Sequence, residues 1–174
     1  MDWERELVIS HLVKQKIAEV DVDQLWENTL PEVAASETQL HALEQRLDHP
    51  LDPQYRAFLL HADGWRAFMQ YIDVFGVADF EGGSRAERAN ELFASLEPIE
   101  PICGFCREDL MPIAVSSLDI DLMLMTRPHT ATPGKLFWFA GGLIDSFTGF
   151  DDWFLAMVDY NRQEYQRLVE DANA

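Results

Sequence analysis

The sequence of 174 residues has little cysteine, few basic residues and no long apolar run. No stretch approaches the roughly eighteen apolar residues of an ordinary transmembrane helix. Only 13 residues are basic against 31 acidic, which gives a formal net charge of −18. A field of that sign repels nucleic-acid phosphates and anionic lipid, and it attracts cationic surfaces. The composition therefore argues against binding to nucleic acid or to a membrane, and it favours a basic partner.

The N-terminal residues also lack the pattern of an export signal. In MDWERELVISHLVKQKIAEV, acidic residues precede the apolar positions, and no positively charged start leads into an unbroken apolar run. Together with the two cysteines, this predicts a reducing, cytoplasmic location. A hydrophobic fraction of 48% is ample for a packed core, and the length favours a single domain over residues 1–174.

The first part of the chain is predicted to be helical. Apolar residues recur at helical spacing over Trp3–Glu19. A short second helix is expected to start at Asp23 and to stop near Pro31. Ser36, followed three residues later by Gln39, predicts a capping box at the start of a third helix.

Asp52 before Pro53 is a preferred pairing at a helix start, so a fourth helix is expected there. Its apolar stripe consists of Tyr55, Phe58, Leu59 and Ala62. Gly64 is placed to end this helix in a left-handed conformation. A further helix is predicted from Ser84 to Leu96.

The strand signals concentrate in the second half. Phe68–Val74 and Met111–Val115 are predicted strands, with Gly76 ending the first. Three further apolar runs are Ile120–Thr126, Lys135–Ala140 and Leu143–Phe147. Gly141 and Gly142 form a two-residue hairpin turn between the last two runs, since both positions accept positive φ. A long helix follows from about Phe150.

This order of elements predicts an α+β fold. We expect a mixed, largely antiparallel sheet with a C-terminal β-meander, flanked by N-terminal helices and by the long C-terminal helix.

Several motifs of this sequence resemble those of a known family. The sequence contains a Leu-x-Pro-x-Tyr-x-x-Phe-Leu motif, a Gly turn and a Phe-Gly strand end. These motifs are similar to those of the SUKH superfamily, which includes the fungal Smi–Knr cell-wall regulators and many bacterial toxin-immunity proteins. The matching positions are Leu51, Pro53, Tyr55, Phe58, Leu59, Gly64, Trp65, Phe75, Gly76 and Asp79. Pro112–Ala114 resembles the family's Pro-Ile-Ala strand. Ile144–Phe147 with Trp153–Leu155 resembles its entry into the last helix.

The resemblance covers about Ser36 to Leu168, and it has two departures. Leu118 stands before Asp119, where the family often has glycine, and residues 1–35 are expected to form a helical extension beyond the minimal domain. The resemblance implies a binding protein without shared catalytic residues, commonly one that neutralises a cognate toxin. The toxins of the superfamily are diverse, so no toxin class is implied. The alternative is a regulatory interaction scaffold like the fungal members.

Cys103 and Cys106 form a C-x-x-C, the spacing of redox dithiols and of half a zinc site. A redox site needs a strand leading into a helix N-terminus, and the residues Glu97–Ile102 make a poor strand. Zinc needs two more ligands, which His49, His61 or His129 would supply only through the fold. We favour structural cysteines, with metal binding and redox chemistry as alternatives.

Two groups are candidates for partner contact. Asp119 and Asp121 alternate along a predicted strand, so they form either a solvated face or an acidic ridge for a partner. Trp65, Arg66 and Tyr71 surround the Gly turn, where large aromatics serve as interface anchors or as core edges. No G-x-S-x-G elbow and no phosphate-binding loop is present. The sequence therefore predicts no catalytic, metal or cofactor site, and a toxin with a basic surface as the partner.

Overall fold

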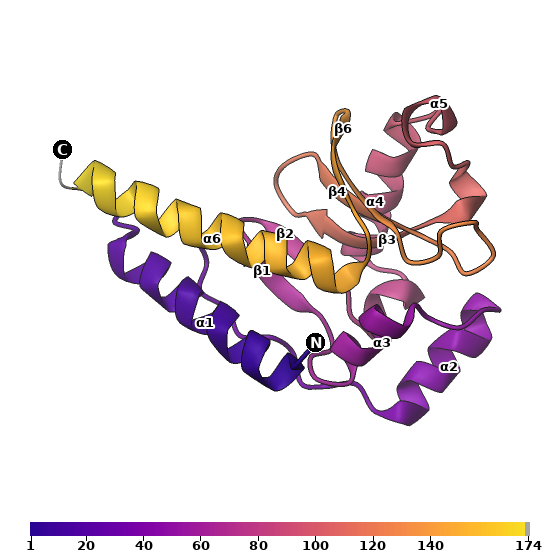
Figure 1. The fold of residues 1–174 in the computed structure, drawn as a ribbon, viewed down its shortest axis with the longest axis horizontal. Helices are drawn as coiled ribbons and strands as arrows, with labels where there is room; N and C mark the ends of the chain where they lie inside the picture. Colours follow the sequence, from indigo (N-terminus) through magenta and orange to yellow (C-terminus); the bar gives the residue numbers. More distant parts are fainter. Residues whose placement is uncertain (173–174) are drawn as a thin grey trace.

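The computed structural model describes residues 1–172, in which six strands form one sheet in the order β1-β2-β3-β4-β5-β6, with every neighbouring pair antiparallel (Figure 1). The strands are β1 (Trp65–Met69), β2 (Ile72–Val74), β3 (Leu110–Ser116), β4 (Asp121–Thr126), β5 (Leu136–Ala140) and β6 (Leu143–Phe147). The sheet is thus a continuous meander, in which each strand pairs with the next one along the chain.

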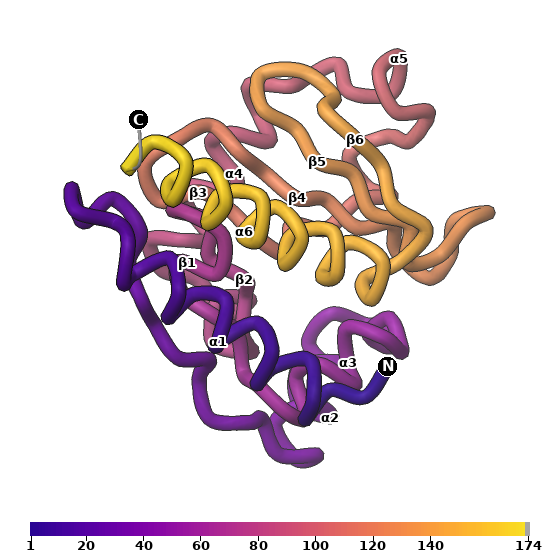
Figure 2. Tube along the Cα trace, turned by 60° about the vertical axis from the view of Figure 1, so that its left-hand side comes forward, coloured from indigo at the N-terminus to yellow at the C-terminus, as the bar shows by residue number. Residues whose placement is uncertain are grey.

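Six α-helices accompany the sheet within the described residues, which confirms the α+β class. They are α1 (Trp3–Val20), α2 (Glu37–Leu47), α3 (Pro53–Leu59), α4 (Ser84–Ser95), α5 (Glu100–Cys103) and α6 (Phe150–Ala172), with 3-10 turns η1 (Val77–Glu81) and η2 (Arg107–Asp109). Figures 1 and 2 show α1 lying alongside α6.

The helices cover both faces of the sheet, so two apolar cores form. Alternate residues of β4 divide between them, because successive side chains of a strand point to opposite faces. Met123 and Met125 pack with residues of α1, α3 and α6, among them Trp3, Phe58 and Phe154. Leu122 and Leu124 pack in the second core with Ala89, Leu92 and Phe93 of α4.

The predicted helix starts are confirmed where a side chain caps the helix. Ser36 accepts a hydrogen bond from the Gln39 amide at 3.3 Å, and the Ser36 amide donates to Gln39 Oε1 at 2.9 Å, which completes the capping box. Asp52 Oδ1 accepts from the Gln54 and Tyr55 amides at 3.0 and 3.1 Å. Both helices therefore begin as the local sequence dictates.

The predicted short helix after Asp23 is wrong. Residues 21–35 contain only turns, extended chain and an isolated bridge between Val33 and Ala62. Contacts with distant residues fix this path: Lys14 Nζ donates to the Glu27 carbonyl at 3.0 Å. The Thr29 hydroxyl also donates to the Arg66 carbonyl. The segment therefore lies between α1 and β1, and it forms hydrogen bonds with both elements.

The predicted strand Phe68–Val74 is in fact a tight hairpin, with β1 and β2 joined through Gln70 and Tyr71. Gln70 has a φ of 49°, the left-handed conformation that a short turn requires. β2 pairs with β3 through Ile72 and Ser116, so a distant strand fixes where the chain reverses.

The two glycines of the family-like segment permit a close crossing of the backbone. Gly64 has a φ of +91°, but it lies beyond the end of α3 rather than capping it. A Cβ on Gly76 would stand 2.2 Å from the Asp63 carbonyl oxygen. Tyr55 secures the crossing by donating its hydroxyl to the Phe75 carbonyl at 2.7 Å. This segment therefore specifies the scaffold.

β1 carries an irregularity at Ala67, which has a φ of 48°. The Ala67 amide donates to Asp73 Oδ1 at 2.7 Å, and its carbonyl accepts from the buried Lys14 ammonium. Asp73 in turn pairs with Arg85 of α4 at 3.1 Å. A chain of charged and backbone groups thus links α1 to α4 through the edge of the sheet.

Candidate functional site

Three hairpin turns meet at one end of the sheet, because alternate connections of a meander lie on the same side. They are Gln70–Tyr71, Ser117–Ile120 and Gly141–Gly142, and we call this region the turn end. The Ser117 amide donates to the Tyr71 carbonyl at 2.8 Å. The Ile120 side chain reaches to 3.2 Å from where a Cβ on Gly141 would lie. The β4–β5 loop lies at the opposite end, and Figure 1 shows it at the right.

The structure brings most of the predicted partner-binding residues to this region. Tyr71, Asp119 and Asp121 lie in or directly beside the turns. Arg66 is exposed and lines a hollow that also includes Ser117. Trp65 is different, because its side chain is 0% exposed.

Trp65 belongs to the core. Its indole nitrogen donates to the Thr29 carbonyl and hydroxyl at 3.3 and 3.2 Å. Its ring packs on Phe68 with centroids 5.2 Å apart. An aromatic residue beside a charged one, the pattern that suggested an interface anchor, is a core position in this protein. Trp65 is therefore not part of the candidate interface.

The prediction that Asp119 and Asp121 share one strand face is wrong, since β4 begins at Asp121. Asp119 lies in the turn before it. There the Ser116 hydroxyl accepts from the Leu118 and Asp119 amides at 3.4 and 2.8 Å. Asp121 is half-buried and accepts from Trp138 Nε1 at 2.7 Å. Burial raises the pKa of the Asp121 carboxyl, and the nearby Asp119 charge acts in the same direction.

The turn end also carries exposed apolar side chains. Leu118 is 68% exposed and Ile120 is 53% exposed. They alternate with the carboxylates of Asp119 and Asp121. The sequence signal for this exposed surface was a pair of large apolar residues beside acids in a tight turn. Such a pair is unusual, because turns normally carry polar residues.

One hollow beside the turn end combines acidic and aromatic side chains, and we call it the acid–aromatic hollow. It has a volume of about 220 Å³ and is lined by Trp26, Met69, Gln70, Asp121, Trp138, Tyr160 and Glu164. It lies on the α6 side of the sheet. Apart from Asp121, none of its residues was identified from the sequence, because they come from elements far apart along the chain.

A second hollow, of about 480 Å³, lies on the α4 side and contains Arg66, Arg85 and Arg88. These arginines are largely neutralised within the protein. Arg66 pairs with Glu27. Arg85 pairs with Asp73 at 3.1 Å and with Asp79 at 3.2 Å. Arg88 lies 4.0 Å from Glu91 and donates to the Asp119 carbonyl at 3.0 Å, so acids of the fold offset much of the positive charge of this hollow.

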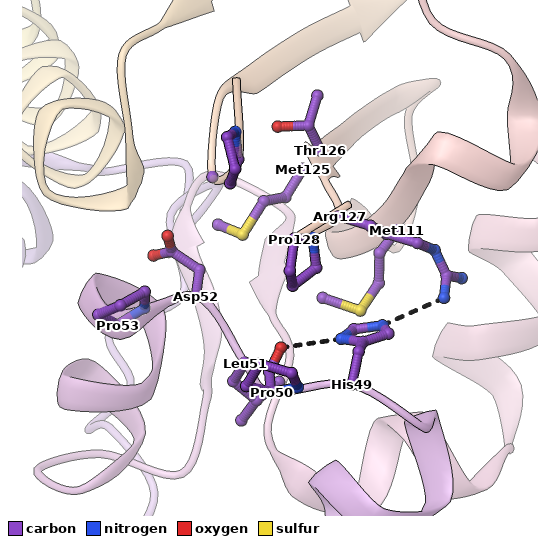
Figure 3. A pocket seen from close by; sticks show the side chains of 12 residues that line it. His49, Pro50, Leu51, Asp52, Pro53, Met111, Met125, Thr126, Arg127 and Pro128 are labelled. Atoms are coloured by element: carbon purple, nitrogen blue, oxygen red, sulfur yellow. Dashed lines mark hydrogen bonds between the residues drawn. The ribbon is translucent and has the colours of Figure 1, made fainter. Parts of the chain in front are cut away.

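A third hollow, of about 170 Å³, lies at the opposite end of the sheet and is shown in Figure 3. The Met111 and Met125 side chains point toward its middle. His49 Nδ1 lies 2.8 Å from the Pro50 carbonyl, and Arg127 Nη1 lies 3.2 Å from His49 Nε2. Both imidazole nitrogens have hydrogen-bond partners, and Asp52 Oδ1 caps α3.

The comparison with known families adds the deciding observation. The model of the SMI1 / KNR4 family (SUKH-1) matches residues 34–156. The chain belongs to this family. No curated protein matches the chain. The SMI1/KNR4 match includes the whole sheet and α2 to α5, while α1 precedes it and α6 continues beyond it.

In this SMI1/KNR4-family chain, the two cysteines are free and half-buried. Burial raises the pKa of the Cys103 thiol, and the hydrogen bond from Cys106 to Asp109, at 3.0 Å, raises the pKa of Cys106. Raised values disfavour the thiolate that redox chemistry and metal ligation need. Cys103 also ends α5 rather than starting a helix. Within residues 1–172, no three His, Cys, Asp or Glu side chains gather as a metal-binding group.

None of the helices in the described part of this SMI1/KNR4-family chain is both long and apolar enough to cross a membrane.

Proposed function

We propose that this protein is an immunity protein that binds a cognate bacterial toxin and occludes its active site or substrate groove. The observation that carries the proposal is the turn end, where exposed Leu118 and Ile120 alternate with Asp119 and Asp121 on an SMI1/KNR4-family scaffold. Tyr71 and Arg66 extend this surface. The protein acts in the cytoplasm, by binding and without catalysis of its own.

The mechanism we propose is steric block aided by charge. Apolar side chains at the centre of an interface supply most of its binding energy, and polar groups around them set orientation. The net charge of −18 accelerates encounter with a basic toxin. We therefore expect the association rate to fall steeply as salt rises, while the dissociation rate changes little.

The test is co-expression with the product of the adjacent gene, followed by measurement of protection and of complex formation. Leu118→Lys should abolish protection, because it places a charge in the centre of the proposed interface. Val8→Lys is the matched control, since Val8 is a similarly exposed apolar residue on α1. If the wild-type pair does not associate and gives no protection, the immunity proposal fails.

The family description also favours a second candidate, a regulatory interaction scaffold like the fungal members. Such a protein would use the same surface for a resident cellular partner. Deletion of the adjacent gene separates the two functions. An immunity role predicts that loss of this protein then becomes harmless, whereas a scaffold role predicts an unchanged defect.

A further inference from the structure

We infer that the acid–aromatic hollow receives one lysine or arginine side chain of the toxin. This inference rests on the proposed function and extends it, because it names the chemistry of the group that the immunity protein recognises.

The hollow has the size and the position for one long side chain. Its volume of about 220 Å³ is several times the ~30 Å³ that a water molecule occupies in the liquid, yet it is too small for a folded element. Gln70 of the β1–β2 turn and Asp121 at the start of β4 both belong to its lining. A partner seated on the turn end would therefore reach the hollow directly.

Three aromatic rings line this space. Trp138 and Tyr160 meet edge to face, with centroids 5.4 Å apart. Tyr160 is 43% exposed, so its ring is accessible from solvent. Trp26 closes the hollow from the loop after α1. Aromatic faces attract ammonium and guanidinium groups, and they pack on the methylene stems that carry them.

The carboxylates give the hollow an unbalanced negative charge. Glu164 is bonded to Arg167, which also pairs with Asp171 at 2.8 Å. Asp121 accepts the neutral indole N–H of Trp138 at 2.7 Å. Among the ion pairs of residues 1–172, none includes Asp121. A half-buried carboxylate without a cation is costly, so an incoming positive group would recover part of that cost.

The two other hollows described above lack this combination. In the arginine-lined hollow Asp73 is already paired with Arg85, and the lining of the hollow in Figure 3 contains no Phe, Tyr or Trp. Among these three hollows, the acid–aromatic hollow alone joins several rings with a carboxylate that forms no ion pair. Charge and chemistry therefore favour a cation over an anion or a purely apolar group.

The first experiment titrates the whole protein with N-acetyl-arginine amide and N-acetyl-lysine amide, following the Trp138 indole N–H signal by NMR. We expect saturable shifts at millimolar concentration, and none with N-acetyl-citrulline amide, the neutral isostere of arginine. Asp121→Asn should weaken the response at least tenfold while still accepting the Trp138 hydrogen bond. Tyr160→Ala, at an exposed position, provides a second variant that leaves the core intact.

Asp159→Asn is the matched control, because Asp159 neighbours Tyr160 on α6 but pairs with Arg162. It should titrate like the wild type. Equal responses to the citrulline and arginine amides, or an unchanged response in both Asp121→Asn and Tyr160→Ala, would overturn the inference.

The second experiment measures toxin affinity for the same variants. We expect at least a tenfold loss for Asp121→Asn and Tyr160→Ala, and no loss for Asp159→Asn. A toxin that binds all four proteins equally leaves the proposed function standing and refutes this inference. If the wild type does not bind the toxin, the proposed function fails, and the amide titration alone decides whether the hollow recognises cations.

Discussion

Gly76 permits two distant parts of the backbone to cross. A Cβ at this position would lie 2.2 Å from the Asp63 carbonyl oxygen and 2.8 Å from the carbonyl carbon. Backbone atoms cannot rotate away as a side chain can, so the crossing itself would have to open. Tyr55 and Val77 are bonded on either side of it, to the Phe75 carbonyl and to Asp63 Oδ1.

We therefore predict that Gly76→Ala lowers the free energy of unfolding by about 2–4 kcal/mol, as for other overpacked core sites. Gly142→Ala is the matched control, since nothing lies within 4 Å of its Cβ position and its φ is not in the left-handed region. It should change stability by less than about 0.5 kcal/mol. Urea unfolding measures both, and equal losses in the two variants would contradict the crossing argument.

Asp121 is a second residue whose environment opposes its own charge, because burial raises the pKa of its carboxyl. An acid whose folded-state pKa is raised binds more protons when folded, so stability falls as pH rises through that range. Above it the ionised carboxylate destabilises the fold, and below the ordinary aspartate pKa the penalty disappears.

Asp121→Asn should accordingly stabilise the protein at pH 7, by on the order of 0.5 kcal/mol after allowance for solvent screening. The gain should vanish at about pH 3, below the ordinary aspartate pKa of 3.8. Chemical unfolding at the two pH values measures it, with Asp145→Asn, an exposed carboxylate of β6, as the control. A loss of stability at pH 7 would show that the negative charge supports the fold instead of opposing it.

At the scale of elements, the irregularity in β1 depends on a buried lysine of α1. Lys14 is buried, and burial lowers its pKa to about 8. Its ammonium bonds to the Glu27 and Ala67 carbonyls, so it joins α1, the following loop and β1. Because the unfolded chain binds the proton more tightly, stability should rise as pH increases from about 8 toward the ordinary lysine value of 10.5.

Lys14→Met removes this titration. The stability of the wild type relative to the variant should increase by roughly 2–3 kcal/mol between pH 7 and pH 10. Lys16→Met, which removes an exposed lysine of the same helix, is the matched control. Comparing wild type and variant at each pH cancels every titration that the two proteins share. A difference that does not change with pH would mean that Lys14 has an ordinary pKa.

Elements with local signals were predictable from the sequence. Ser36 and Asp52 cap α2 and α3 with side chains that bond within three residues, so the helix starts need no distant information. Gly141, with a φ of +72°, likewise marks the β5–β6 turn. The α+β class followed from these elements and their order.

Elements fixed by distant contacts were not predictable. Gln70 adopts a positive φ without glycine, asparagine or proline beside it, because β2 must pair with β3. The loop after α1 does not form the predicted helix, because contacts made by Lys14 and Thr29 hold it in another path. The burial of Trp65 and the existence of the acid–aromatic hollow were not predictable for the same reason. Both depend on how several elements pack together, and the spacing of residues along the chain does not contain that information.

For the whole molecule, the dominant quantity is the charge of −18, which repels itself in the compact state. We predict that raising sodium chloride from 0.05 to 0.3 M increases the melting temperature by about 2–4 °C, which corresponds to ~1 kcal/mol in a chain of this size. Calorimetry measures the shift.

The matched variant for this prediction combines Glu19→Gln, Asp23→Asn and Glu32→Gln. These three exposed acids form no ion pair among the described residues, and replacing them removes three negative charges. The variant should melt higher than the wild type at low salt and respond less to added salt. An identical response in both proteins would mean that surface repulsion does not limit stability.

The acid–aromatic hollow is divided between two kinds of sequence. Met69, Gln70, Asp121 and Trp138 lie inside the region that the family model matches, whereas Trp26, Tyr160 and Glu164 lie outside it. Three of the seven lining residues thus come from segments outside the region that the family model matches. Under the proposed function, substitutions in these flanking segments would change the rings of the hollow, while Asp121 and the exposed Leu118 and Ile120 stay in the matched region.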